Sequence, residues 1–291
     1  MNSNEKEDAY KQFSKEAEEY EKQYKESDLI NFYPEHQYRL QIFLDCLKTI
    51  NPSNILDIGC GSGMPLISIL EQGYNINGFD FSDEMVAQAR KNLSIMGFDP
   101  NRVTKNNMED IQGIAYSEYD CIIALGSLYY SRDFNKTINA ISALLPQKGH
   151  LIFSLRNELF SLFSLNEYSA DYFSSKLIPI EKLSNDLKSS VNELLQKRFA
   201  PEQIVQKFKT VDNKGIYSIL HNPLTVADEI LTPNNLKLEN VYYYHYHALP
   251  PVFEHTDTKI FRELSSQMEK PKDWRGTFMC SSFVVHATKI D

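Results

Sequence analysis

Short apolar runs alternate with helix-like segments through the first half of the chain. An apolar run over 55–58 is followed by a helical pattern over 64–71, and a second run over 75–79 ends at Asp80. Ser82 can cap a further helix over 82–96, because its hydroxyl can accept a hydrogen bond from an amide of the first turn. This order is typical of strands that pair in parallel through crossover helices.

The alternation continues up to about residue 155. The other elements expected here are a helix over 35–49, strands over 102–105, 119–125 and 150–155, and a helix over 133–145 that Pro146 ends. The pattern predicts an α/β fold with a doubly wound, mostly parallel sheet and helices on both faces.

The pattern changes after Arg156, where about 65 residues separate the strand from the next core helix. We interpret 156–222 as an α+β cap insertion with a helix over 181–199 and a hairpin around Asp212–Gly215. A helix over 224–231 and two antiparallel strands over 241–249 and 281–288 then complete the sheet. The predicted organisation is an N-terminal lid helix (1–34), a cofactor-binding core (35–155), the cap (156–222) and a C-terminal part of the core sheet (223–291).

The N-terminal segment carries aromatic residues at helical spacing. They are Tyr10, Phe13, Tyr20 and Tyr24, with Ala17 on the same face. Such a stripe predicts either a helix packed on the domain or a lid over a ligand.

Composition restricts the partners. The chain has 30 Lys+Arg against 39 Asp+Glu, a formal net charge of -9, which disfavours nucleic acid as a partner. Its four cysteines form no zinc or disulfide pattern, and no run of about 18 apolar residues occurs. We expect a soluble, cytoplasmic protein with no membrane partner; the oligomeric state stays open.

The segment 57–63, Asp-Ile-Gly-Cys-Gly-Ser-Gly, is the most informative motif. Glycines between a strand and a helix let the backbone approach a ligand closely. A nicotinamide-type fingerprint would need glycine where Met64 stands. Asp80 ends the next strand, where a carboxylate can accept both hydroxyls of a ribose.

These residues resemble the class I S-adenosylmethionine-dependent methyltransferases over about residues 54–155. The resemblance implies a Rossmann-like, seven-stranded sheet and S-adenosylmethionine as the methyl donor. The cofactor contacts that it implies are Asp57, Gly59, Cys60, Gly61, Gly63, Asp80, Phe81, Met85, Asn107, Met108, Glu109, Leu125 and Gly126. Family members often have aspartate where Asn107 stands, which weakens the expected contact to adenine.

Other residues are assigned from their chemistry. Tyr20, Tyr24 and Tyr33 can stabilise a sulfonium through cation–π contact, and Arg39 can pair with the methionine carboxylate. The end of the strand predicted over 119–125 reads Ala-Leu-Gly-Ser-Leu-Tyr-Tyr over 124–130 and lacks the Asn/Asp-Pro-Pro-Tyr/Phe element of nucleobase methyltransferases. The acceptor is therefore expected to be a small molecule.

The run 242–247 places Tyr243, His245 and His247 on one strand face. Either histidine can be a base or a satisfied structural residue, and no further ligands for a metal lie in register. The candidate catalytic residues are His245, His247 and Tyr129. The candidate substrate contacts are Tyr20, Tyr130, Arg156, Asn157 and Arg275.

Together these features predict a methyltransferase that acts on an oxygen or nitrogen of a small molecule. The two histidines and the arginines favour oxygen and an anionic, saccharide or nucleotide-linked acceptor. Two alternatives stay open, a nicotinamide-dependent oxidoreductase and a non-catalytic module that binds S-adenosylmethionine.

Overall fold

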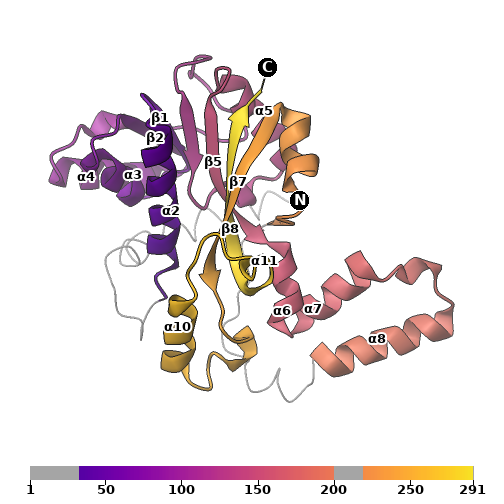
Figure 1. Cartoon of the computed structure of the whole chain (residues 1–291). Coiled ribbons are helices and arrows are strands. Elements are labelled where there is room, and N and C mark those ends of the chain that lie inside the picture. Colours follow the sequence, from indigo (N-terminus) through magenta and orange to yellow (C-terminus); the bar gives the residue numbers. More distant parts are fainter. Residues whose placement is uncertain (1–32, 200–218, 291) are drawn as a thin grey trace.

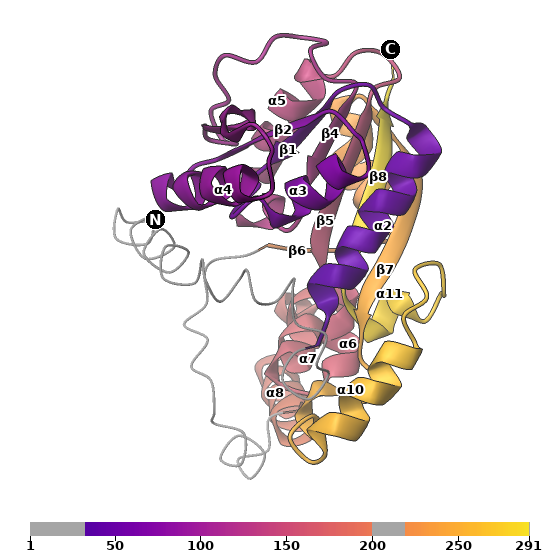
Figure 2. The ribbon, with the colours of Figure 1, turned by 90° about the vertical axis from the view of Figure 1, so that its left-hand side faces the viewer.

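The computed structural model describes residues 33–199 and 219–290. Its centre is a sheet in the order β3-β2-β1-β4-β5-β8-β7, with β6 paired to β5 (Figures 1 and 2). The strands are β1 (Ile55–Ile58), β2 (Ile76–Asp80), β3 (Val103–Lys105), β4 (Cys121–Ala124), β5 (His150–Asn157), β6 (Leu220–His221), β7 (Leu236–Tyr246) and β8 (Cys280–Lys289). Strands β1–β5 pair in parallel, and β8 runs antiparallel to β5 and β7. The predicted doubly wound, mostly parallel sheet is confirmed.

Helices cover both faces of this sheet (Figure 1). The α-helices of the described residues are α2 (Glu35–Ile50), α3 (Met64–Glu71), α4 (Asp83–Ile95), α5 (Phe134–Leu144), α6 (Ser161–Ser164), α7 (Glu167–Tyr172), α8 (Asn185–Phe199), α10 (Thr258–Gln267) and α11 (Gly276–Met279), of which α2–α5 cover the sheet. Phe43, Leu66 and Leu93 of α2–α4 form one buried cluster with the sheet. Ile138 and Ile141 of α5 belong to the cluster on the other face.

The expected helix starts in the core are confirmed at their caps. The Ser82 hydroxyl accepts a hydrogen bond from the Met85 amide at 3.2 Å. The Asp133 carboxylate accepts one from the Lys136 amide at 3.1 Å. Both side chains satisfy an amide that the helix itself leaves without a partner, and so they fix where α4 and α5 begin.

The segment after β5 contains helices α6–α8, which lie with α10 beyond one end of the sheet (Figures 1 and 2). The helix expected from residue 181 starts only at Asn185, because the Ser184 hydroxyl accepts from the Leu187 amide and caps it there. The helix expected over 224–231 is a π-helical turn over Ala227–Leu231. Most of the expected hairpin lies outside the described residues, and its described end forms β6.

The two closing strands are antiparallel, as expected. Strand β7 starts at Leu236, five residues earlier than predicted, and ends at Tyr246 instead of residue 249. His245 has a left-handed φ of 61°, which interrupts regular strand geometry at this end. In the described ranges, no helix has the length and apolar character needed to cross a membrane.

His150 and His286 form a pair across β5 and β8, with Nδ1 and Nε2 3.0 Å apart. Burial and the neighbouring His150 lower the pKa of His286 to about 4. The unfolded chain therefore takes up this proton near pH 6.5, before the folded chain does. The stability that neutral His286 contributes is present above pH 6.5 and is lost as the pH falls towards 4.

We therefore expect the His286→Gln variant to lose less stability on acidification than the wild type. Between pH 7 and 4.5 the difference in unfolding free energy is expected to reach about 2 kcal/mol. Urea unfolding at both pH values measures it. Parallel pH dependences in the two proteins would show that His286 does not titrate in this way.

Candidate functional site

The loop after β1 forms a hollow at the carboxyl end of the sheet. Gly59 has a φ of 71°, and a Cβ there would lie 2.5 Å from the Ser127 Cβ. The Ser127 hydroxyl donates to the Ile58 carbonyl oxygen at 2.6 Å, so the loops after β1 and β4 are joined. Only glycine fits this conformation and this close approach.

Asp57 lies beneath this loop at the end of β1. Its side chain is 1% exposed, and neither carboxylate oxygen has a hydrogen-bond partner. Burial and the nearby Asp80 raise the pKa of Asp57 to about 7, against the opposing effect of Arg39. A buried carboxylate without donors is costly, which indicates that a cationic or donor group of a ligand completes this site.

Asp80 ends β2 beside the same loop. Its carboxylate accepts hydrogen bonds from the Gly61 amide at 2.9 Å and the Ser82 amide at 3.0 Å. Burial raises the pKa of Asp80 although these bonds favour the ionised form. A carboxylate has about four acceptor positions, so these bonds leave acceptor capacity for a ligand hydroxyl.

Arg39 reaches this hollow from α2. Its guanidinium is buried, with Nη2 2.8 Å from His36 Nδ1. It packs so closely on Gly126, after β4, that a Cβ at this glycine would overlap with Nη1. The structure thus brings together the predicted Asp57, Gly59, Asp80 and Arg39.

The expected adenine contacts lie on neighbouring loops. Met85 is buried on α4, whereas Phe81 is 42% exposed at the hollow's rim. Asn107 Oδ1 accepts from the Glu109 amide at 3.0 Å, and Glu109 Oε1 accepts from the Arg132 amide at 2.7 Å. The side-chain oxygen of Asn107 is therefore already engaged by its own turn.

The other predicted cofactor contacts also lie at this edge of the sheet. Cys60 and Leu125 are buried, Met108 packs partly buried against the core, and Gly61 and Gly63 have left-handed φ angles of 53° and 77°. Tyr20 and Tyr24 lie outside the described residues.

A second cluster of polar side chains joins the start of α2 to the end of β7. His245 Nδ1 lies 2.5 Å from a Glu35 carboxylate oxygen and 2.8 Å from the Ser281 hydroxyl. Tyr33 stacks on the His245 ring at 5.0 Å and donates its hydroxyl to Glu269 at 2.6 Å. We call Tyr33, Glu35, His36, His245 and His247 the histidine cluster.

Burial and charge give the members of this cluster different protonation states. Burial opposes the charged form of His245, but the Glu35 carboxylate raises its pKa above the ordinary value. Burial alone would raise the pKa of Glu35, yet the ion pair with His245 lowers it strongly. Burial and Arg39 lower the pKa of His36 to about 4. At neutral pH, His36 is therefore neutral beside an ionised Glu35.

His247 is enclosed by aromatic rings, with Phe160 at 4.6 Å, His245 at 4.8 Å and Phe261 at 5.8 Å between ring centroids. Both ring nitrogens are buried without a hydrogen-bond partner. Burial and the neighbouring His245 hold its pKa well below the usual range. His247 is therefore a neutral ring with no route for proton exchange through its buried nitrogens.

Tyr129 and Tyr130 form a platform after β4, with their rings 4.5 Å apart. The Arg156 guanidinium, at the end of β5, lies 5.1 Å from the Tyr129 ring centroid. The described residues offer Arg156 no carboxylate partner within ion-pair distance. Its exposed charge is thus available to an anionic group.

Asn157 and Arg275, predicted as substrate contacts, are engaged in the fold. The Asn157 amide donates to the carbonyl oxygens of Thr277 at 2.9 Å and Cys280 at 2.8 Å. The Arg275 guanidinium pairs with Asp273 at 2.6 Å. These bonds anchor α11, so the geometry favours structural roles over the substrate contacts expected for both residues.

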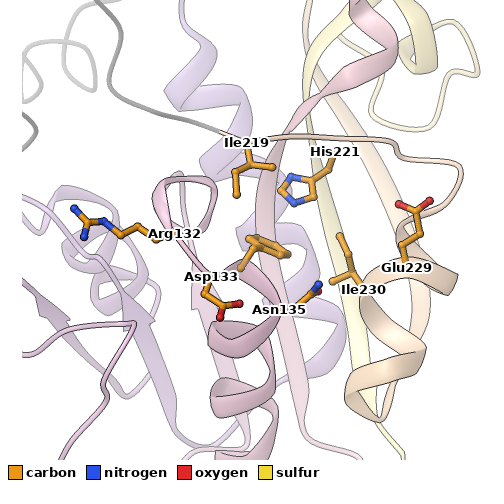
Figure 3. A pocket seen from close by; sticks show the side chains of 8 residues that line it. Arg132, Asp133, Asn135, Ile219, His221, Glu229 and Ile230 are labelled. Atoms are coloured by element: carbon orange, nitrogen blue, oxygen red, sulfur yellow. The ribbon is translucent and has the colours of Figure 1, made fainter. Parts of the chain in front are cut away.

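A separate cavity of about 470 Å³ lies beside the start of α5 (Figure 3). Its lining includes Arg132, Phe134, Ile219 and His221, and none of the glycine-loop residues. The Ile219 amide donates to the Tyr129 carbonyl oxygen at 3.0 Å, so the cavity adjoins the tyrosine platform. Its volume is in the range of small-molecule sites.

Comparison with known proteins identifies this arrangement. Residues 51–188 match the model of a family described as a methyltransferase domain. This match and the shared fold confirm the resemblance over the core, with a methyltransferase domain in residues 51–188 on a fold like that of the class I methyltransferases.

Relatives of the methyltransferase domain act on different atoms, according to their names. Glycine/sarcosine/dimethylglycine N-methyltransferase of Actinopolyspora halophila is 30% identical over 134 residues, 45% of this chain and 24% of that protein. Ubiquinone biosynthesis O-methyltransferase of Histophilus somni is 28% identical over 155 residues, 51% of this chain and 65% of that protein. The chain thus spans less than two thirds of the length of these two relatives.

Solved structures share the fold of the methyltransferase domain. The YcgJ protein of Bacillus subtilis has a TM-score of 0.51 at 14% identity and covers 88% of this chain and 99% of its own. Magnesium protoporphyrin IX methyltransferase of Synechocystis, crystallised with bound SAH, has a TM-score of 0.50 at 14% identity, over 87% and 83% of the two chains.

Sequence reasoning missed Glu35, His36 and Glu269. Glu35 and Arg39 are four residues apart on one predicted helix, a spacing that puts them on one face. That signal was present in the sequence. The partner of Glu35, His245, is 210 positions away along the chain, and no local pattern joins the two. In the described ranges, no group of three or more side chains could hold a metal ion.

Proposed function

We propose that this protein transfers a methyl group from S-adenosylmethionine to an oxygen of a small anionic acceptor. The observation that carries the proposal is Asp57, a fully buried carboxylate without a partner beneath a glycine loop, beside Asp80. A ligand with a cationic amino-acid end and a ribose matches both carboxylates. Magnesium protoporphyrin IX methyltransferase of Synechocystis was crystallised with bound SAH, which supports the same donor for this chain.

The residues present fit this donor. Asp57 would pair with its ammonium group, Arg39 with its carboxylate, and Asp80 with its ribose hydroxyls. When bound, S-adenosylmethionine supplies an electrophilic methyl group for in-line displacement. The chain's part is to align the acceptor and to exclude water.

The acceptor side favours oxygen and a negative charge. The exposed Arg156 on the tyrosine platform suits a carboxylate or phosphate of the acceptor. The histidine cluster offers a base, which an alcohol needs and an amine does not. The names of the relatives include both oxygen and nitrogen methylation, so they support either atom.

Two measurements test the proposal. S-adenosylhomocysteine is expected to raise the melting temperature, and NADH is not. With isotopically labelled donor, an anionic hydroxyl compound from a metabolite library is expected to gain the label. A melting temperature raised by NADH alone would support a nicotinamide enzyme instead. Binding without transfer to any compound would indicate a cofactor-binding module.

A further inference from the structure

The Glu35–His245 pair has the geometry of an acid–base pair. His245 Nδ1 faces the Glu35 carboxylate at 2.5 Å, and this contact joins the first residue of α2 to the end of β7. A carboxylate at Nδ1 fixes the tautomer in which Nδ1 carries the proton and Nε2 has a free lone pair. Among the described residues, none hydrogen-bonds His245 Nε2.

Stacking and the local backbone conformation hold the His245 ring in place. Tyr33 stacks on one face at 5.0 Å with an interplanar angle of 24°. Tyr33 is itself held by the Glu269 carboxylate, which also accepts from the Tyr246 amide at 2.9 Å. His245 also has a left-handed φ of 61°, which is strained for a residue other than glycine. Backbone strain of this kind often persists at functional sites.

The pair lies beside the donor site. Glu35 and Arg39 share one face of α2, and Arg39 packs on Gly126 at the mouth of the hollow. The charged and titratable groups facing His245 are Tyr33 before α2, Glu35 and His36 on α2, His247 just after β7, and Glu254 and Glu269 near α10. The three carboxylates favour its protonated form, whereas His247 stays neutral.

We propose that His245 is the general base of methyl transfer and Glu35 its positioning residue, and that the acceptor is an acidic hydroxyl such as a phenol. The proposal rests on the function proposed above. The acceptor hydroxyl gives its proton to Nε2 as its oxygen bonds the methyl carbon. The carbon–sulfur bond breaks with its electron pair left on sulfur, and the imidazolium stays paired with Glu35.

The acceptor class follows from proton affinity. A histidine can take a proton effectively from a hydroxyl with a pKa near 10, as in tyrosine, but poorly from an alkyl alcohol, whose proton is held far more tightly. His247 does not compete as the base, since both of its ring nitrogens are buried. The aromatic rings of Tyr33, which stacks on His245, and of Phe160, which packs on the neighbouring His247, suit a planar acceptor.

Glu35→Gln is the decisive variant, with Glu35→Asp as the conservative one. Glu239→Gln is the matched control, because Glu239 forms its ion pair with Lys237 at the distant start of β7. Imidazole NMR of the S-adenosylhomocysteine complexes should show His245 protonated at Nδ1. In Glu35→Gln the pKa of His245 is expected to fall, and Glu239→Gln should leave it unchanged.

Transfer is measured with three matched probes: 4-hydroxybenzoate, 4-(hydroxymethyl)benzoate and 4-aminobenzoate. We expect methylation of the phenol only. Glu35→Gln should lower kcat roughly 10–100-fold and move the acid limb of the rate profile to lower pH, while Glu35→Asp recovers part of the rate. Affinity for S-adenosylhomocysteine should stay within about threefold, which separates this test from that of the donor site.

Three results would overturn the inference. The first is a pKa and tautomer of His245 that are the same in Glu35→Gln as in the wild type. The second is a pH profile of the rate that does not change in Glu35→Gln. The third is transfer to the amine or the alkyl alcohol in preference to the phenol. If the wild-type protein does not bind S-adenosylhomocysteine, the proposed function itself is contradicted.

Discussion

Replacing Asp80 with alanine is expected to weaken the binding of S-adenosylhomocysteine about thirtyfold. The variant would lack the charge-assisted hydrogen bonds from the ribose hydroxyls to the Asp80 carboxylate, which reduces the binding free energy by about 2 kcal/mol. It would also release the Gly61 and Ser82 amides, which it holds at 2.9 and 3.0 Å and which shape the glycine loop. Isothermal titration calorimetry measures the effect.

Asp120 provides the matched control for this variant. Its carboxylate accepts from the Ser53 and Asn54 amides, both at 2.8 Å, at the opposite end of β1. Asp120→Ala therefore removes the same type of bond far from the donor site. It should reduce stability and leave affinity unchanged. Equal affinities in Asp80→Ala and the wild type would refute the assignment of Asp80 to the ribose.

Replacing Gly59 with alanine is expected to lower the free energy of unfolding by about 2–4 kcal/mol. About 1 kcal/mol comes from a side chain at positive φ, and the rest from the overlap of the new Cβ with Ser127. Relief of this overlap would push apart the loops after β1 and β4. The same variant should therefore bind S-adenosylhomocysteine weakly.

The Gly73→Ala variant separates the cost of a side chain at positive φ from the cost of Cβ overlap. Gly73 also has a positive φ, 88°, but a Cβ there would meet nothing within 4 Å. It should cost only about 1 kcal/mol and leave binding intact. Urea unfolding of both variants gives the comparison. Losses of equal size would mean that the loops after β1 and β4 are not closely packed at Gly59.

The fold could be predicted where local pattern decides it. The strands β1 and β4 are buried throughout, and their residues are correspondingly apolar except for Asp57 in β1. Caps such as Ser82 and Asp133 mark helix starts with a single side chain. The start of β7 was predicted too late, because its first residues are alternately exposed and their pattern is weak.

The donor half of the site was also accessible to sequence reasoning, since its residues fall within one motif and the next strand end. The acceptor half was not. His245 was singled out as a candidate base, but its partner Glu35 is brought to it only by the packing of α2 on β7. Asn157 and Arg275 looked free in the sequence because their partners, the carbonyl oxygens around α11 and Asp273, were not evident there. The proposed lid, cap and domain limits stay predictions.

The place of β8 bears on how the protein is made. This strand, Cys280–Lys289, lies between β5 and β7, although both of those strands precede it in the chain. During translation one edge of β5 therefore stays unpaired, and β7 has no neighbouring strand in the sheet, until more than 280 residues have left the ribosome. A nascent chain stalled before that point would expose unpaired strand edges, and we expect it to depend on chaperones or to aggregate.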